Sequence, residues 1–230
     1  QRFVKDPTEW LAVQDRVAKV MRKAGNAAGE RRAYEQALAY AQARQGRVGE
    51  RGMAAVAEAQ YRALEPAFEA YDRIDFAVPG KLSPQRQVKW LKDQLQFKSA
   101  KLLDLQKRYT AVVETKQAEP AVCALYKIGL GYQRFAGALQ HAPIPKELRR
   151  EKALADDYRA QLAQVAEAPQ KKAVEALEYA MTKSRELGVS NACSAAATAL
   201  LVQYKPDLYG PPVEQVPPLA APRAAPGRAA

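Results

Sequence analysis

Histidine is almost absent from this sequence, which contains only His141. A single histidine in a proline-flanked turn is more typical of a surface residue than of a catalytic base or a metal ligand. The CxxC, P-loop, GxSxG and GxGxxG motifs are absent as well. Asp156 and Asp157 are adjacent, but neighbouring helix residues point in different directions and do not form an acid/base pair. The sequence therefore predicts no enzyme, no metal site and no cofactor.

Long apolar runs are also missing. The longest apolar stretch covers residues 195–202, whereas a helix that crosses a bilayer needs ~20 residues. We therefore predict no membrane-spanning segment. The first residue is Gln1, not methionine, which favours a fragment or a mature form. No segment alternates polar and apolar residues as a half-buried strand does, so the sequence predicts an all-α protein.

Acidic residues are outnumbered, because 25 aspartates and glutamates oppose 36 lysines and arginines, giving a formal net charge of +11 at pH 7. Such an excess favours an acidic protein, a nucleic acid or an anionic lipid as partner. It is concentrated in residues 81–116, where nine residues are basic and three are acidic. This segment is either a solvated helix face or a docking surface. For a docking surface, the predicted partner-binding residues are Lys89, Lys92, Lys101 and Arg108.

Nucleic-acid binding needs stacking or base-reading groups beside the basic residues. Trp90, Phe97 and Tyr109 lie in the basic segment. Tyr109 falls on its apolar side, however, and no known nucleic-acid-binding module is recognisable. The sequence therefore favours a protein partner with an acidic surface, and it suggests no small-molecule substrate.

Capping residues, prolines and glycines divide the first half of the chain into helices. Residues 6–9 predict a helix start with a capping box, and Gly25 ends this helix. A second helix begins near Glu30. A third begins near Met53 and breaks near Glu65, because Pro66 lacks a backbone donor. The predicted inner faces are Trp10, Val13, Val17 and Val20 in the first helix, and Tyr34, Ala37, Leu38 and Ala41 in the second.

Residues 83–115 predict the longest helix of the chain. Apolar residues repeat there with coiled-coil-like spacing, and Lys98 interrupts them. The helix is either an arm packed antiparallel on neighbouring helices or part of a dimeric coiled coil. The members of the apolar seam are Val88, Leu91, Leu95, Leu102, Leu105, Tyr109 and Val112.

One motif fits the first helix of a tetratricopeptide repeat, with Leu125, Ile128, Gly129 and Tyr132 on a single helix face. Glycine inside a helix costs about 1 kcal/mol relative to alanine. We therefore expect a second helix to approach Gly129 closely. The sequence offers one at Ala173, Leu177 and Ala180.

The expected second helix is displaced along the chain. Pro143 and Pro145 force a non-helical joint, and a helical insertion is predicted at about 146–167, before a new helix start at Pro169. The repeat region covers about 119–204, with a last helix capped by Ser190 or Asn191. We thus predict one helical-repeat domain over 1–209 and a disordered Pro/Ala-rich tail over 210–230.

Cys123 and Cys193 are the only cysteines, and each falls near the start of a predicted helix. If these helices are successive first helices of stacked repeats, both sulfurs lie at the same level. A disulfide is then possible and would indicate an oxidising compartment. The alternative is a pair of separately buried free cysteines.

From about Met53 to Tyr209 the chain resembles tetratricopeptide-type cell-envelope proteins of myxobacteria and related bacteria. The residues that carry the resemblance are Ala59–Tyr61, Ala124–Tyr132, Ala142–Pro145, Lys172–Leu177 and Arg185–Gly188 with Asn191. The resemblance implies an α-solenoid, export across the inner membrane and a place in a multiprotein envelope assembly, of which gliding-motility complexes are one example. It supplies no catalytic residues. Arg185 departs from the pattern, because it stands where the repeat places a closing proline.

The sequence and the resemblance together predict an irregular tetratricopeptide-like solenoid that serves as a non-catalytic scaffold or adaptor in the periplasm or cell envelope. Its expected partners are envelope proteins with acidic surfaces. The alternative is binding of nucleic acid or anionic lipid through the basic segment 81–116. A peptidoglycan-processing role would require a cleft in which carboxylates gather.

Overall fold

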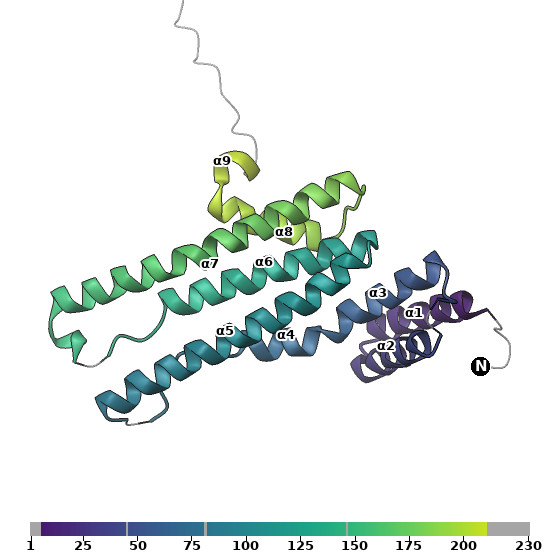
Figure 1. The fold of residues 1–230 in the computed structure, drawn as a ribbon. Helices are drawn as coiled ribbons and strands as arrows, with labels where there is room; N and C mark the ends of the chain where they lie inside the picture. Colours follow the sequence, from purple (N-terminus) through teal and green to yellow (C-terminus); the bar gives the residue numbers. More distant parts are fainter. Residues whose placement is uncertain (1–5, 45, 81, 146, 211–230) are drawn as a thin grey trace, which may run out of the picture.

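The computed structural model describes residues 6–44, 46–80, 82–145 and 147–210, and the regular structure in these ranges is entirely helical (Figure 1). The all-α prediction is therefore confirmed for the described residues. The predicted disordered tail lies, from residue 211 onward, outside them. The elements are α1 (Pro7–Lys23), α2 (Ala27–Gln42), α3 (Glu50–Ala63), α4 (Glu65–Asp72), α5 (Pro84–Glu114), α6 (Ala118–Gln140), the 3-10 turn η1 (Leu148–Arg150), α7 (Lys152–Glu186), α8 (Ala192–Tyr204) and α9 (Pro206–Tyr209).

Helices α1, α2 and α3 pack into an N-terminal three-helix bundle (Figure 1). Asp6 caps α1 by accepting a hydrogen bond from the Thr8 amide. The predicted capping-box residue, Glu9, instead forms an ion pair with Arg51 of α3. The core of the bundle contains Trp10, Leu11, Ala18, Ala33, Tyr34, Ala37, Ala55, Val56 and Ala59.

The predicted inner face of α1 is wrong except at Trp10. Val13, Val17 and Val20 are 38%, 37% and 61% exposed. The buried stripe is instead formed by Leu11 and Ala18, two turns apart, which are fully buried against α2 and α3. α1 therefore has two apolar stripes, one with the valines and one with Leu11 and Ala18. The stripe with Ala18 is buried, because its small side chain allows α2 and α3 to approach closely.

The break predicted at Pro66 is confirmed. α3 ends at Ala63, and α4 begins at Glu65 with the proline in its first turn. The missing backbone donor of proline has no cost there, because the first amides of a helix lack intrahelical partners. The short break joins α3 of the N-terminal bundle to α4, which packs on α5 and α6.

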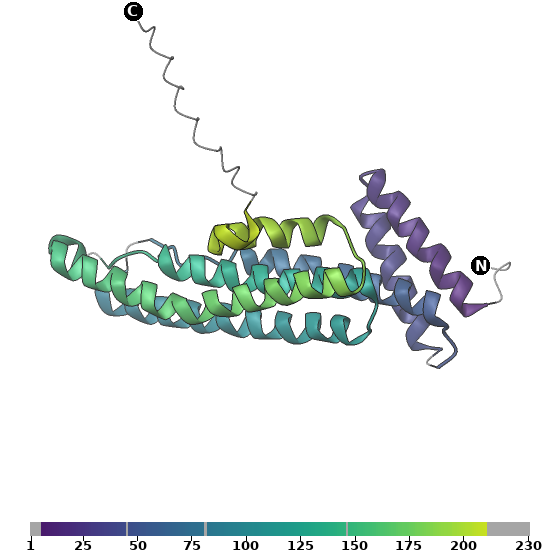
Figure 2. The ribbon, with the colours of Figure 1, turned by 90° about the horizontal axis from the view of Figure 1, so that it is seen from above.

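Three long helices, α5, α6 and α7, form a layer in which α6 lies between the other two (Figure 1). α4 packs on α5 and α6, while α8 packs on α6 and α7 (Figure 2). α3 contacts α5 and α6 as well as the N-terminal bundle, so it belongs to both halves of the molecule. The largest core cluster joins residues of α3, α4, α5, α6 and α7.

The predicted helical insertion over 146–167 is not a separate helix. α7 runs without interruption through Pro169 for 35 residues, and it is longer than α5, which has 31 residues. The prediction that the 83–115 helix is the longest is therefore also wrong. Pro169 deprives the Val165 carbonyl of a donor, but Val165 is 57% exposed, so water can hydrate that carbonyl. Ala166 and Ala173, which are fully buried, anchor the helix on both sides of the proline.

The seam of α5 differs from the predicted heptad pattern at two positions. Val88 is 59% exposed, and Gln87 is buried in its place. A straight helix drifts by about 20° per heptad, so a residue three heptads from Tyr109 has rotated out of the seam. Lys98 does not interrupt the seam, since it is only 2% exposed.

Buried Lys98 caps the neighbouring helix α4. Its ammonium group donates hydrogen bonds to the carbonyl oxygens of Tyr71, at 3.3 Å, and Ile74, at 2.5 Å. Tyr71 lies in the last turn of α4 and Ile74 just after its C-cap, and the C-terminal end of a helix favours a positive charge. Burial lowers the pKa of Lys98, while the charges of Asp72 and Asp75 act in the opposite direction.

Among the described residues, no helix is both long and apolar enough to cross a membrane.

Candidate functional site

The residues of the predicted repeat pair meet where α6 crosses α7. Leu125, Ile128 and Tyr132 of α6 are buried, as are Ala173, Leu177 and Ala180 of α7. A Cβ atom on Gly129 would lie 2.6 Å from Leu177 Cγ and 3.2 Å from the Ala173 carbonyl oxygen. Because Gly129 has no side chain, α7 can approach α6 closely at this point. The close approach explains why a glycine occupies the interior of α6. This contact fixes α7 along α6.

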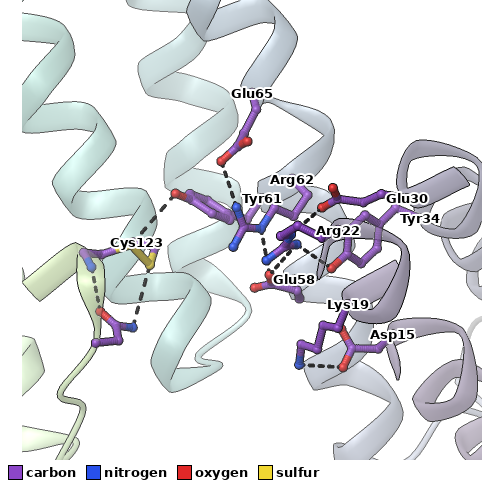
Figure 3. Close-up of polar contacts among 12 residues, drawn as sticks. Asp15, Lys19, Arg22, Glu30, Tyr34, Glu58, Tyr61, Arg62, Glu65 and Cys123 are labelled. Atoms are coloured by element: carbon purple, nitrogen blue, oxygen red, sulfur yellow. Dashed lines mark hydrogen bonds and ion pairs between the residues drawn. A yellow bond between two sulfur atoms is a disulfide. The ribbon is translucent and has the colours of Figure 1, made fainter. Parts of the chain in front are cut away.

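Cys123 and Cys193 form a disulfide that joins the first turns of α6 to the first turn of α8, with their Cα atoms 5.1 Å apart. Of the two alternatives left open by the sequence, the structure contains the bonded pair. The Asn191 side chain caps α8 and also contacts Cys123 Sγ at 3.8 Å. The Tyr61 hydroxyl lies 3.9 Å from Cys193 Sγ (Figure 3).

A network of charged side chains extends from the disulfide into the N-terminal bundle (Figure 3). Glu58 of α3 is its centre, since its Oε1 atom lies 2.8 Å from Arg62 Nε and 3.6 Å from Arg22 Nη2. Arg22 of α1 also donates to Glu30 and to the Tyr34 hydroxyl of α2. The network therefore ties all three helices of the bundle together.

The network continues towards α4 and the disulfide. Arg62 donates a second hydrogen bond to Glu65, at 3.0 Å, and lies over the Tyr61 ring. Burial alone would lower the pKa of Arg62, but the hydrogen bond and charge of Glu58 raise it above the ordinary arginine value. Burial raises the pKa values of Tyr34 and Tyr61, so both hydroxyls stay neutral in this environment. These residues form a polar connection between the N-terminal bundle and α4.

A cleft of about 470 Å³ lies beside this network, between α1, α3 and the start of α6. Three carboxylates line it, from Asp15, Glu58 and Glu119, together with Arg16, Lys19 and Arg51. Asp15 is 2.7 Å from Lys19, and Glu58 is bonded to the network arginine Arg62. Two of the three carboxylates are therefore paired with cations, and not with each other.

The four predicted partner-binding residues are all exposed on α5, but they form two pairs, not one patch. At about 100° per residue, Lys89 and Lys92 point roughly 140° away from Lys101 and Arg108. Arg108 lies 3.6 Å from Asp104, and the two residues line a small cleft against α4 with Lys101.

The aromatic residues of the basic segment lie in different environments. Tyr109 is fully buried, Trp90 is half-buried and Phe97 is 49% exposed. Phe97 has the ammonium group of Lys101 5.4 Å from its ring centroid. The three rings therefore do not form a row of stacking platforms along the basic residues.

A second large cleft, of about 560 Å³, surrounds the end of α4. Lys98 contributes to its wall together with Asp72, Asp75, Arg134 and His141. Arg134 pairs with Asp72 at 3.4 Å, and His141 Nδ1 lies 2.7 Å from the Gly137 carbonyl oxygen. The single histidine is thus an exposed residue that closes the end of α6.

The charged network and the capping lysine were not predicted from the sequence. Arg62 follows Glu58 by four residues and precedes Glu65 by three, a spacing that favours ion pairs on one helix face. That local signal was available. The contacts of Arg22 with α2 and α3 depend on how the helices pack, and no local pattern indicates them.

No family model matches this chain, and neither a curated protein nor a solved structure is significantly similar to it.

Proposed function

We propose that this chain is a non-catalytic scaffold or adaptor of the bacterial cell envelope, built as an irregular tetratricopeptide-like helical fold. The observation that supports it most directly is the Cys123–Cys193 disulfide, because structural disulfides persist in oxidising compartments such as the periplasm. A gliding-motility complex is one setting consistent with the resemblance.

The scaffold role is supported by the shape of the helical layer. Three long helices present extended surfaces, and the close α6–α7 pair at Gly129 is the kind of contact on which tetratricopeptide repeats are built. The α6–α7 pair is longer than a 34-residue repeat, because α7 continues without interruption. We therefore propose an irregular form of the repeat. With a net charge of +11, the chain favours partners with acidic surfaces.

Affinity capture from the native envelope fraction tests the proposal, with mass spectrometry to identify the captured proteins. Wild-type chain is compared with the charge-reversal variants Lys89→Glu/Lys92→Glu and Lys101→Glu/Arg108→Glu. We expect an acidic protein whose capture weakens with salt and with at least one variant pair, while helicity is unchanged. Equal capture by all three chains would exclude these four basic residues as the surface that binds the partner. Non-reducing peptide mass analysis of the native protein should find the linked cysteines, and two free thiols would remove the support for an oxidising compartment.

The second candidate is binding of nucleic acid or anionic lipid through exposed cations of α5, such as Lys89 and Lys92. Binding to phosphates releases counterions, so its affinity falls steeply with salt. Filter binding of DNA and RNA, and sedimentation with anionic vesicles, should each be measured at two salt concentrations. Micromolar, salt-sensitive retention that the charge-reversal variants abolish would favour this candidate over an acidic protein.

A further inference from the structure

An apolar groove runs between α5 and α7, with α6 as its floor. It has a volume of about 440 Å³. Leu103 of α5 and Val165 of α7 lie on its two sides and are 55% and 57% exposed. Phe135 and Leu139 of α6 form the floor.

The groove lies on the face of the helical layer that α4 and α8 leave free. Leu103 and the buried Leu105 are two residues apart on α5, so they point in nearly opposite directions, and Leu105 lies on the α4 side. On α7, Val165 and Val174 point in opposite directions, and Val174 packs against the cluster that includes residues of α8. Within the described ranges, no element packs over Leu103 and Val165 on this face.

Lysines flank the exposed aliphatic side chains of the groove on both α5 and α7. Lys92 precedes Gln96 and Ser99 on the lining side of α5, and Lys107 follows Leu103 by one turn. On α7, Lys172 stands two turns after Val165 and reaches over the Tyr132 ring of α6. None of the described lining residues is charged, and no acidic residue lies three or four positions from Leu103 or Val165.

We propose that this groove binds one amphipathic helix of a partner protein, with apolar residues seated on Leu103, Phe135 and Val165 and acidic residues meeting Lys92, Lys107 and Lys172. An amphipathic helix in a hydrophobic groove is a recurrent mode of recognition, and the surrounding lysines select acidic flanks over basic ones. The inference rests on the proposed scaffold function and names the surface and the form of the partner.

A synthetic peptide is the probe for the test. It is a fluorescent amphipathic helix of about 20 residues, long enough to hold helical structure, with leucines on one face and glutamates on the other. A scrambled peptide of equal composition and a version with lysine in place of glutamate are the controls. Binding to the full disulfide-bonded chain is measured by fluorescence anisotropy.

We expect the acidic helix to bind at least tenfold more tightly than either control. Leu103→Glu and Val165→Glu should each weaken binding at least tenfold, whereas Val20→Glu, at an exposed valine of α1, should not. Both lining positions are exposed, and circular dichroism with thermal unfolding verifies that the variants fold. Equal binding of the scrambled peptide, or unchanged binding by Leu103→Glu and Val165→Glu, would overturn the proposal.

Two further measurements separate the other occupants. Concentration-dependent self-association that Val165→Glu abolishes would assign the groove to a second copy and overturn the helix proposal, as would preferential binding to phosphatidylglycerol vesicles. Capture of the same native partner by wild type and by Leu103→Glu would leave the scaffold function standing and refute only the groove. A photoreactive residue at Ser99 should cross-link to an acidic helical segment of that partner.

Discussion

Gly129 and Gly137 lie in the same helix, α6, but in different surroundings. A Cβ on Gly129 would collide with Leu177, whereas a Cβ on Gly137 has nothing within 4 Å. Gly129→Ala should therefore lower the free energy of unfolding by roughly 1–3 kcal/mol through overpacking. Gly137→Ala should raise it by up to about 1 kcal/mol through helix propensity. Urea unfolding of both variants measures the difference, and the same sign for both would refute the close contact.

Lys98 supplies a second prediction at the scale of the residue. Lys98→Met keeps the length of the side chain but removes the donor from the Tyr71 and Ile74 carbonyls. The Tyr71 carbonyl keeps the Ile74 amide as a donor, whereas the partly buried Ile74 carbonyl loses the ammonium group. We expect the free energy of unfolding to fall by roughly 1–3 kcal/mol, because an acceptor that is shielded from water and lacks a donor is costly. Lys107→Met, on the exposed side of the same helix, is the control and should change it by no more than about 0.5 kcal/mol. Equal urea midpoints for the two variants would contradict the capping role.

At the scale of the element, helix ends could be predicted where one residue acts on its own backbone. Asp6, Pro66 and Asn191 are such residues. Each lies at the expected helix start or within the first turn of the helix. The buried face of α1 depends on the helices that pack against it, so the valine stripe beginning at Val13 predicted the wrong face. In the sequence, Pro169 predicts a helix start. In the structure, α7 continues through Pro169 because it packs against α6 on both sides of the proline.

The candidate site was predictable only in part, for a similar reason. Cys123 and Cys193 could be placed at comparable levels from helix register, but the sequence did not decide whether they were bonded. Lys98 breaks the apolar pattern of α5 in the sequence, but its capping role depends on α4 ending beside it, which no local pattern indicates. The groove at Leu103 and Val165 joins helices that are separated by the whole of α6.

Pro169 leads to a prediction for α7. Pro169→Ala restores a backbone donor to the Val165 carbonyl in an uninterrupted helix. We expect the free energy of unfolding to rise by roughly 1–3 kcal/mol, up to the full penalty of an interior proline. Far-UV circular dichroism should stay the same, because the residues on both sides are already helical. A clear gain of helicity would instead support two separate helices, as the sequence predicted.

At the scale of the whole molecule, the disulfide links positions that are 70 residues apart. Closing a loop of this length stabilises the native state by roughly 4 kcal/mol in the chain-entropy estimate. The variant Cys123→Ser/Cys193→Ser should lose about that much in urea unfolding. Reductant should destabilise the wild type towards the variant and leave the variant unchanged. If reductant shifted both equally, the stabilisation would have another origin.

Buried tyrosines give the molecule a characteristic response to alkaline pH. Burial raises the pKa values of Tyr34, Tyr61, Tyr71 and Tyr109 well above the ordinary value of about 10. A group whose pKa is raised by folding stabilises the native state below its unfolded pKa, and this contribution is lost as pH rises further. Above pH ~10, stability should therefore fall by up to about 1.4 kcal/mol per pH unit for each tyrosine.

Urea midpoints between pH 8 and 11, with tyrosinate absorbance as a second probe, test this dependence. The absorbance of the four tyrosines should appear together with unfolding and not before it. Tyr61→Phe should reduce the slope of stability against pH by about one tyrosine, whereas Tyr179→Phe, at a 48% exposed position, should not. Ionisation of all tyrosines in the folded chain would contradict the burial.

The disulfide also determines how this molecule would carry a mechanical load. Tension applied between the residues before Cys123 and those after Cys193 passes through the sulfur bridge, because the bridge is the shortest covalent path. Most of α6 and all of α7 lie inside the closed loop, so the covalent path of the tension bypasses this hairpin. A pull on both ends would therefore act on the helices outside the closed loop, α1 to α5 on one side and α8 with α9 on the other, while the sulfur bridge keeps the ends of the hairpin together.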